Sequence, residues 1–446
     1  VDSLAYWNDP QGERDQQFQP PFKGSDGDAE KYITFTVDTG GWNNIRMSME
    51  IIFVIAAATG RTLVLPPKAP LYRLRGDLKN IHRGFADFFP LDTEEFQKKV
   101  KIISTEEFVE KEGGANGVAP IPEDMREGVM KSVKVCNKMK KMDNACENIA
   151  QYLSQVGHVP DARAKDYCFV FDEDVFNGDE VSDESEESIS TFCGTRKRAF
   201  WNPDMNQQAV VHFRAGEKEW RLLAHFYGFI HFTNPAIGNY YKRFVRDYLR
   251  YNDQIYCSAG KIVKALQAEA AERGFDPDEE GAGGFSALHV RRGELQYKKV
   301  KIPAEEWYEN TKEIWKPKEI LFIATDERNK TFFDPLAAHF DIRFLDDYFE
   351  LAGLGDLDPN YFGMIDTIIS SRGRAFAGTW FSTFTGYINR MRGYHGMTMM
   401  DTWYSFLPNK EKSHHWENID HFAFAFEWPD GWIGIDGDVT PSKDVF

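Results

Sequence analysis

Two arginines and a histidine stand close together in the run FSALHVRRGELQ, residues 285–296. The apolar and small residues that open the run predict a buried strand, which ends on His289, Arg291 and Arg292. In α/β proteins, ligands bind beyond the carboxyl ends of such strands. The planar guanidinium of arginine matches two phosphate oxygens at once. The run therefore predicts a binding site for a phosphate or a pyrophosphate.

Two further strand ends in the second half of the chain carry polar residues. Asp326 follows the apolar run ILFIAT, and Ser382, Thr383 and Phe384 lie shortly after the run GRAFAGT, where a helix is expected to begin. The carboxylate can accept hydrogen bonds from a nucleobase or a ribose, and the N–H groups of a helix start can bind an anion. Taken singly, such residues are more often ion-pair partners or helix caps. Because the carboxyl ends of parallel strands converge, their combination predicts a nucleotide-diphosphate site.

The first half of the chain contains a glycine turn, DTGGWNN, after another predicted strand. Gly40 and Gly41 allow the backbone to approach a ligand closely. Asn43 and Asn44 can either cap the helix that follows or contact the ligand, and the sequence leaves both roles open.

The elements that must position these residues alternate between strand and helix. In the first half, strand 31–38, helix 44–59 and strand 62–66 form a βαβ unit. The second half is expected to continue the alternation, with strands over 285–290, 319–326, 342–348 and 373–379 and helices over 303–315, 328–340, 361–372 and 382–394. This rhythm predicts an α/β fold with parallel, doubly wound sheets.

A chain of 446 residues is too long for a single core, so we expect two domains. After an irregular arm over 1–29, the first domain is expected over 30–255. The second is expected over 256–446, with its C-terminal segment packing back onto the rest.

The middle of the chain is the least regular part of the sequence. We expect a cysteine-containing insertion over about 95–200, in which the acidic run 172–188 is a solvated loop. The stretch 207–257 is expected to be helical, including the strongly apolar run 221–232.

The cysteines indicate the compartment. Cys136, Cys146, Cys168 and Cys193 fall within 58 residues, which favours two disulfides and a secretory compartment. Reduced, buried thiols are the alternative. Cys257 lies in a predicted helix and is expected to belong to the core.

The composition limits the possible partners. A net charge of −17 argues against general binding of nucleic acid or acidic membranes, so an anionic ligand must be held by a local basic pocket. No apolar run approaches the roughly 20 residues needed to cross a bilayer. The chain opens without a signal peptide, which leaves room for a signal or membrane anchor that was removed from it. Without a CxxC or a histidine pair at i, i+4 spacing, we expect no metal site and no cofactor.

Several of these segments resemble the motifs of one protein family. GGWNNIRMSMEIIFVIAAATGRTLVLPP resembles the N-terminal motif of the protein O-fucosyltransferases and their plant and fungal relatives. ALHVRRGELQ resembles their HxR motif and the HVRR motif of the core α-1,6-fucosyltransferases, and FIATDE and FAGTWFSTFTGYINRMRG resemble the two remaining motifs. The resemblance covers roughly residues 30–400, with a weak stretch around 100–195.

The resemblance implies a GT-B fold, in which two Rossmann-like domains face each other across a donor and acceptor cleft. It also implies that fucose is transferred from GDP-fucose to a hydroxyl of a protein or glycan, with inversion and without a metal ion. The expected location is the lumen of the Golgi or the endoplasmic reticulum.

The matching motifs carry roles to particular residues. Arg291 would neutralise the β-phosphate of the leaving GDP, and His289 would lie against the donor. Asp326 would hold the guanine or its ribose. The residues expected to wrap the pyrophosphate and the base are Ser382, Thr383 and Phe384.

The glycine turn carries roles in the same way. Gly41 and Asn43 would contact the pyrophosphate or the fucose, beside Gly40 and Asn44, and Asn43 would share the catalytic role with Arg291. Some members of the family use a glutamate in this motif as the general base, and the matching position here is Gly40.

The sequence therefore leaves open which group acts as the catalytic base, and it also leaves two alternative functions. The base could be Asp38, Glu217, Glu294, a group on the acceptor or a water, or the departure of GDP could be so advanced that no strong base is needed. Two rival functions are the use of another nucleotide sugar, such as UDP-rhamnose, and the binding of a glycan or peptide by a non-catalytic relative.

Overall fold

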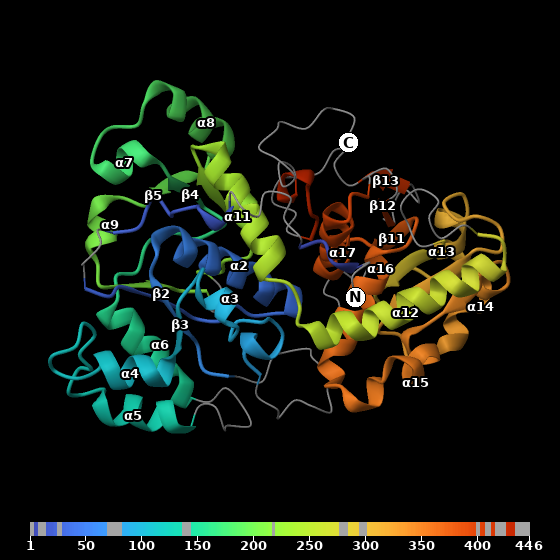
Figure 1. The fold of residues 1–446 in the computed structure, drawn as a ribbon, viewed down its shortest axis with the longest axis horizontal. Helices are drawn as coiled ribbons and strands as arrows, with labels where there is room; N and C mark the ends of the chain where they lie inside the picture. The colour runs from blue at the N-terminus through green and yellow to red at the C-terminus, as the bar shows by residue number, and fades with distance from the viewer. Residues whose placement is uncertain are drawn as a thin grey trace. The chain divides into compact units, whose positions relative to one another are not determined.

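The computed structural model describes most of the chain: residues 4–7, 15–24, 29–68, 83–135, 144–215, 219–275, 284–293, 301–397, 402–405, 412–414 and 425–432. The chain forms two compact units. Of the described residues, 15–250 form the first unit, and 251–432 form the second together with the N-terminal residues 4–7. Each unit is an α/β structure in its own right (Figure 1). The predicted α/β class is thus confirmed.

The first unit is built on a parallel sheet with the strand order β3-β2-β1-β6. The strands are β1 (Tyr32–Phe35), β2 (Thr62–Leu65), β3 (Ile102–Ser104) and β6 (Val210–Phe213). The βαβ unit is present as predicted, since α2 (Trp42–Thr59) connects β1 to β2 and ends at Gly60 with a left-handed φ of 63°. The connections run in opposite directions from β1, so a topological switch point lies between β1 and β6.

Helices α4, α5 and α6 pack on the strands through an apolar cluster that includes Tyr32, Phe108, Val129 and Tyr152. Helix α2 contacts β1, β2, α10 and α11. The helices of this unit are α3 (Glu94–Gln97), α4 (Thr105–Glu112), α5 (Arg126–Val135), α6 (Asn144–Val156), α7 (Glu173–Asn177), α8 (Asp183–Cys193), α9 (Pro203–Gln207), α10 (Phe226–Phe229) and α11 (Pro235–Tyr248).

A second, smaller parallel sheet in this unit has the order β5-β4-β7. Its strands are β4 (Tyr167–Phe171), β5 (Lys197–Phe200) and β7 (Ile230–Phe232). Two predictions were therefore wrong. The stretch 95–200 is largely regular. The stretch 207–257 is not helical throughout, because residues 210–213 form β6 beside β1 and the last three residues of the run 221–232 pair with β4.

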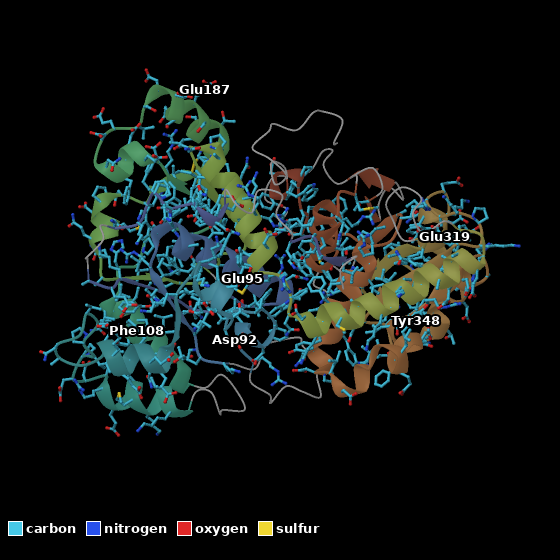
Figure 2. The ribbon with its side chains drawn as sticks, viewed as in Figure 1. Asp92, Glu95, Phe108, Glu187, Glu319 and Tyr348 are labelled. Atoms are coloured by element: carbon cyan, nitrogen blue, oxygen red, sulfur yellow. A yellow bond between two sulfur atoms is a disulfide. The ribbon has the colours of Figure 1, made fainter. Side chains whose placement is uncertain are left out.

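The acidic run 172–188 was also predicted wrongly as a loop. It contains α7 and the start of α8, whose N-caps Asp172 and Ser182 accept hydrogen bonds from the first turns. Acidic side chains near a helix N-terminus interact favourably with its dipole, so the charge supports these helices. Glu187 on α8 remains exposed (Figure 2).

The second unit contains a six-stranded sheet with the order β10-β9-β8-β11-β12-β13, parallel except for its last pair. The strands are β8 (Ser286–Val290), β9 (Ile320–Thr325), β10 (Asp341–Arg343), β11 (Phe376–Thr379), β12 (Thr402–Ser405) and β13 (Lys412–His414). The first five follow the doubly wound order 3-2-1-4-5, which confirms the predicted topology and puts the switch point between β8 and β11. Strand 342–348 is shorter than predicted, because Asp347 accepts a hydrogen bond from the Phe344 N–H and begins a 3₁₀ turn.

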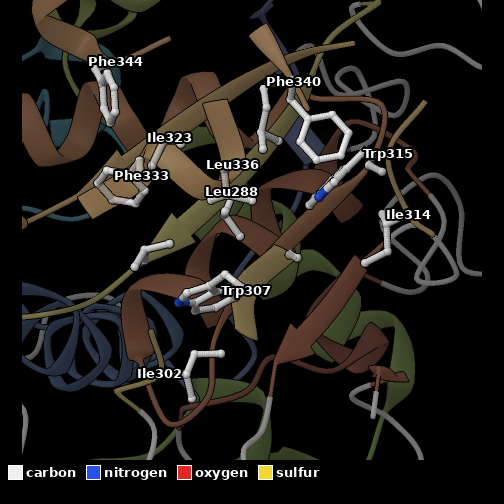
Figure 3. Close-up of a cluster of buried hydrophobic side chains, with 14 residues drawn as sticks. Leu288, Ile302, Trp307, Ile314, Trp315, Ile323, Phe333, Leu336, Phe340 and Phe344 are labelled. Atoms are coloured by element: carbon white, nitrogen blue, oxygen red, sulfur yellow. The ribbon is translucent and has the colours of Figure 1, made fainter. Parts of the chain in front are cut away.

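Helices cover both faces of this sheet. On one face, Trp307, Phe333 and Leu336 from α13, α14 and the turn before it pack on Leu288 and Ile323 of the central strands (Figure 3). Helix α16 contacts β8 and β9 and also packs against α12 and α17. The helices are α12 (Asp253–Glu272), α13 (Ala304–Thr311), α14 (Asp334–Ala337), α15 (Phe349–Ala352), α16 (Phe362–Ser371) and α17 (Thr383–Tyr394).

An ion pair ties the amino ends of the central strands. Glu319, labelled in Figure 2, is buried and accepts hydrogen bonds from Ser286 Oγ and from Nε and Nη2 of Arg374. The polar groups at this end are therefore used for structure, whereas the carboxyl ends carry the predicted site.

The cysteines are only partly as predicted. Cys168 on β4 and Cys193 at the end of α8 form a disulfide, which confirms one predicted bridge. The side chains of Cys136 and Cys146 lie outside the described part of the chain. Cys257 is a free, exposed thiol on α12, so its assignment to the core was wrong.

Candidate functional site

The predicted anion-binding residues of the second unit gather at the switch point between β8 and β11. The two strands pair with Gly378 opposite His289, so their carboxyl ends stop side by side. Beyond β8 the chain continues into Arg291, and beyond β11 it turns into α17 at Ser382. The structure thus brings His289, Arg291 and Ser382 to one edge of the sheet.

Thr379 joins the two strand ends. Its Oγ1 accepts a hydrogen bond from the Arg291 N–H at 2.9 Å and donates one to the His289 carbonyl at 3.2 Å. The side chain is fully buried. The backbone on which Arg291 stands is therefore fixed from the neighbouring strand.

A second threonine fixes the tautomer of His289. The Thr385 Oγ1 hydroxyl donates to the Thr379 carbonyl at 3.0 Å, so at its 2.7 Å contact with His289 Nδ1 it must accept. Nδ1 consequently carries the proton, and Nε2 is left as an acceptor. Burial lowers the pKa of His289 to about 3, and Arg291 acts in the same direction while Asp326 opposes it. The imidazole is neutral at physiological pH, beside the ring of Phe384 at 4.5 Å between centroids.

Asp326 holds the loop that follows β8. Its carboxylate accepts hydrogen bonds from the N–H of Arg292 at 2.6 Å and the N–H of Gly293 at 3.0 Å. Its Oδ2 also lies 4.0 Å from Arg291 Nε. A Cβ atom at position 293 would fall well inside van der Waals contact with Asp326 Oδ2, so a larger residue there must displace that carboxylate.

The two arginines have different surroundings. Arg292 lies over the ring of Phe332, 4.1 Å from its centroid, and its Nε is 3.3 Å from Glu327 Oε2. Those contacts engage the Arg292 side chain within the protein, so Arg291 is the better candidate for the predicted ligand.

Ser382 is the N-cap of α17 but does not act as a cap. Its hydroxyl makes no hydrogen bond to the first turn, and Oγ is buried without a partner among the described residues. Just before it, Phe381 has a left-handed φ of 55°, which is costly for an aromatic residue and is typical of functional turns. A helix N-terminus with an unsatisfied buried hydroxyl is suited to bind an anion.

Asp366 is a further candidate that the sequence did not indicate. It lies on α16 one turn after Gly363, and a Cβ at Gly363 would be 3.7 Å from the Phe384 ring. Among the described residues, Asp366 Oδ1 has no hydrogen-bond partner. Burial, and secondarily the charge of Asp346, raise the pKa of Asp366 well above its usual range. The sequence did not indicate Asp366 because it lies inside an apolar helical pattern. Thr379 and Thr385 were missed for a different reason, since the residues around them follow an ordinary helix-capping pattern.

The glycine turn of the first unit follows β1 at the other switch point. Gly40 has a φ of 108°, and a Cβ there would be 2.7 Å from Asn44 Nδ2. Asn43 is buried in the first turn of α2, where its Oδ1 accepts a hydrogen bond from Arg46 Nε at 3.1 Å. Gly41 is the N-cap and has no side chain to offer.

Asp38, a candidate base, holds this turn in place. Its carboxylate accepts hydrogen bonds from the Thr39 N–H, from Arg221 Nε at 2.8 Å and from the Leu222 N–H at 3.1 Å. Burial raises the pKa of Asp38, although Arg221 opposes the shift. The other two candidates, Glu217 and Glu294, lie outside the described residues.

The first unit also contains a cavity of about 480 Å³ beside the ends of β2 and β3. Its lining mixes apolar side chains such as Leu65, Phe85 and Ile103 with the acidic Asp92 and Glu107. Within the described ranges, no three His, Cys, Asp or Glu residues are grouped so as to hold a metal ion. The helices that the structure describes include none long and apolar enough to cross a membrane.

The sequence matches the family described as GDP-fucose protein O-fucosyltransferase over residues 32–395. The chain belongs to this family. It is therefore a glycosyltransferase, and the predicted resemblance is confirmed. A search of curated proteins gave no match.

Solved structures show a weaker likeness to this O-fucosyltransferase family member. The apo form of POFUT1 is 14% identical with a TM-score of 0.38, covering 86% of this chain and 100% of its own. POFUT1 in complex with GDP-fucose is 16% identical with a TM-score of 0.38, covering 86% and 99%. The fucosyltransferase NodZ from Bradyrhizobium is 13% identical with a TM-score of 0.39, covering 82% and 94%. The family assignment rests on the sequence match.

The closeness of Gly293 to the Asp326 carboxylate predicts that adding a methyl group at position 293 lowers stability. Gly293→Ala should displace the Asp326 carboxylate, break its bonds to the loop and lower the free energy of unfolding by about 1–3 kcal/mol. Urea denaturation measures the change. The matched control is Gly114→Ala, where a Cβ meets no atom within 4 Å and stability should stay within about 0.5 kcal/mol. Equal stability of the two variants would show that the loop does not depend on this contact.

The lowered pKa of His289 predicts a pH dependence of stability. The unfolded chain binds a proton on this ring near pH 6.5, but the folded protein does so only near pH 3. Stability is therefore lost as pH falls between these values, by up to about 1.4 kcal/mol per pH unit from this group. In His289→Gln, urea unfolding between pH 6 and 4 should show a shallower slope by nearly that amount. An unchanged slope would mean that the ring is protonated in the folded protein.

Proposed function

We propose that this family member transfers fucose from GDP-fucose to a hydroxyl of a protein or glycan acceptor, with inversion and without a metal ion. The two units correspond in this proposal to the Rossmann-like domains of a GT-B glycosyltransferase. The donor binds at the β8–β11 switch point of the second unit. Family membership supports the fucosyl transfer, and the chemistry of the switch point supports the donor site.

The observation that carries the proposal is the unsatisfied hydroxyl of Ser382. A buried hydroxyl without a partner is costly in a folded protein. Here it stands at the start of the 12-residue helix α17, whose first N–H groups have no acceptors within the helix. Pyrophosphate oxygens would accept hydrogen bonds from the Ser382 hydroxyl and from these N–H groups.

Arg291 would supply the largest catalytic contribution. Negative charge develops on the β-phosphate as the bond between the anomeric carbon and the phosphate oxygen breaks. A cation whose backbone is already fixed by Thr379 stabilises that charge without reorganising. Together with the N-terminus of α17, it would do what a divalent ion does in other transferases.

Inversion requires the acceptor hydroxyl to attack the anomeric carbon on the face opposite GDP. Its proton must pass to a base, and Asp38 already accepts three hydrogen bonds that hold the glycine turn. We therefore assign Asp38 to structure. Glu217, Glu294, an acceptor group and a water remain as candidates, and Asn43 would contact the substrate through its amide.

Asp366 is a better candidate than Asp326 for recognising the guanine base of the nucleotide. The carboxylate of Asp326 is engaged by the backbone of Arg292 and Gly293, whereas Asp366 Oδ1 is unbonded among the described residues. Guanine presents two neighbouring donors, N1–H and the 2-amino group, which match the two oxygens of a carboxylate. Uracil presents only one. Burial favours the protonated form of Asp366 in the free protein, and the two guanine donors would favour the ionised form on binding.

We also propose that the protein acts in the lumen of the secretory pathway, in the Golgi or the endoplasmic reticulum. The Cys168–Cys193 disulfide favours an oxidising compartment.

Replacing Arg291 tests the catalytic assignment. Arg291→Ala should lower the rate of GDP release from GDP-fucose by about 10²–10³-fold, because the developing charge loses its cation. Arg292→Ala is the matched control, and it should lose less than about tenfold since that guanidinium is held by Glu327 and Phe332. Equal losses in both, or a normal rate in Arg291→Ala, would remove Arg291 from the donor site.

Nucleotide binding tests whether Asp366 recognises guanine, and it also tests the two rival functions. Calorimetry should show that GDP binds at least about tenfold more tightly than IDP, which lacks the 2-amino group, and more tightly than UDP. In Asp366→Asn, the preference for GDP over IDP should shrink to within about threefold. Preference for UDP would favour the use of another nucleotide sugar, and no binding of any nucleotide would favour a non-catalytic binding protein.

A further inference from the structure

Helix α2 contains a buried ion pair among apolar side chains. Arg46 and Glu50 are 0% and 1% exposed, and Arg46 Nη1 donates to Glu50 Oε1. The residues that follow them, from Ile51 to Ala58, are all apolar and buried. A buried pair of charges in such an apolar helix needs an explanation.

Stability does not explain the pair. Removing two charges from water costs several kcal/mol for each, and replacing a buried ion pair by apolar residues of similar size is often neutral or stabilising. Two methionines, like the neighbouring Met47 and Met49, would suit this interior. The pair therefore points to a role in placing another group.

That group is the Asn43 amide. Arg46 Nε donates to Asn43 Oδ1 at 3.1 Å, while another nitrogen of the same guanidinium binds Glu50. The three residues are spaced i, i+3 and i+7, so they lie along one face of the helix. Arginine can only donate hydrogen bonds, so the atom that faces it must be the amide oxygen.

The Nδ2 end of the amide is thereby directed away from Arg46. Among the described residues, the Arg46 contact is the only hydrogen bond of the Asn43 side chain, although the residue is 5% exposed. A buried amide with a fixed oxygen and an unused NH₂ group is ready to donate to a ligand.

We propose that Arg46, held by Glu50, is a positioning residue that orients the Asn43 amide so that its NH₂ group, and not its oxygen, is presented to the substrate. The inference rests on the proposed function, in which Asn43 contacts the substrate. Without Arg46 the amide can rotate by 180° and present its oxygen, which repels an anionic or oxygen-rich substrate. The benefit is orientation before binding, so the loss should fall on turnover rather than on GDP affinity.

The test is a mutant cycle on the full chain with GDP release from GDP-fucose as the readout. The variants are Asn43→Ala, the double variant Arg46→Met/Glu50→Met, and the triple variant that combines them. The double variant should lower kcat by about 10–100-fold and leave the Kd for GDP within about threefold. The triple variant should be no slower than Asn43→Ala alone, within about twofold, because Arg46 acts only through Asn43.

Two further variants separate positioning from folding. Arg46→Lys keeps the charge beside Glu50 but lacks the planar guanidinium whose Nε and Nη1 are held in fixed directions toward Asn43 and Glu50, so it should show the same loss of kcat. The matched control, Arg243→Met/Asp15→Asn, removes another buried ion pair of the same unit, with Nε–Oδ2 2.7 Å, and should leave kcat within about twofold.

The outcomes distinguish this inference from the proposed function. Normal kcat in the double or the lysine variant, losses that multiply in the triple variant, or a normal rate in Asn43→Ala would overturn the positioning role while the proposed function stands. A wild-type chain that releases no GDP from GDP-fucose would overturn both.

Discussion

The hydroxyl of Thr379 joins the carboxyl ends of β8 and β11, and the proposed donor site depends on that junction. At a topological switch point the two connecting helices leave in opposite directions, so the strand ends are not covered by either. Thr379 fixes the backbone of Arg291, and Thr385 fixes the ring of His289 from the same side. Side chains from distant parts of the sequence thereby acquire one geometry before any ligand arrives.

Local geometry also explains how a strongly acidic protein could bind an anionic ligand. A protein with a net charge of −17 repels an anion at long range, so binding must come from fixed groups at short range. The structure provides them as one guanidinium, a helix N-terminus and the Ser382 hydroxyl, while His289 is kept neutral by burial. The carboxylate of Asp326 accepts hydrogen bonds from the loop backbone, which partly offset its negative charge.

The sequence predicted what depends on local pattern. Apolar runs that end in polar residues located β8, β9 and β11, and the glycines located the turn before α2, because both signals lie within a few residues. The β4–β5–β7 sheet was missed because its pairings join residues far apart in sequence, and a short apolar run such as 230–232 fits a helix equally well. Thr379, Thr385 and Asp366 were missed because their roles depend on partners from other elements. Ser382 was correctly predicted at the start of a helix. The sequence could not show that its hydroxyl makes no capping hydrogen bond, because the same residues would precede a helix whose N-cap does make one.

The most direct test is a crystal structure of the full chain with GDP. We expect the diphosphate to lie at the β8–β11 switch point, with a phosphate oxygen at about 2.5–3.2 Å from both Ser382 Oγ and the Arg291 guanidinium. A diphosphate bound elsewhere on the protein, with the Ser382 hydroxyl still without a partner, would contradict this expectation.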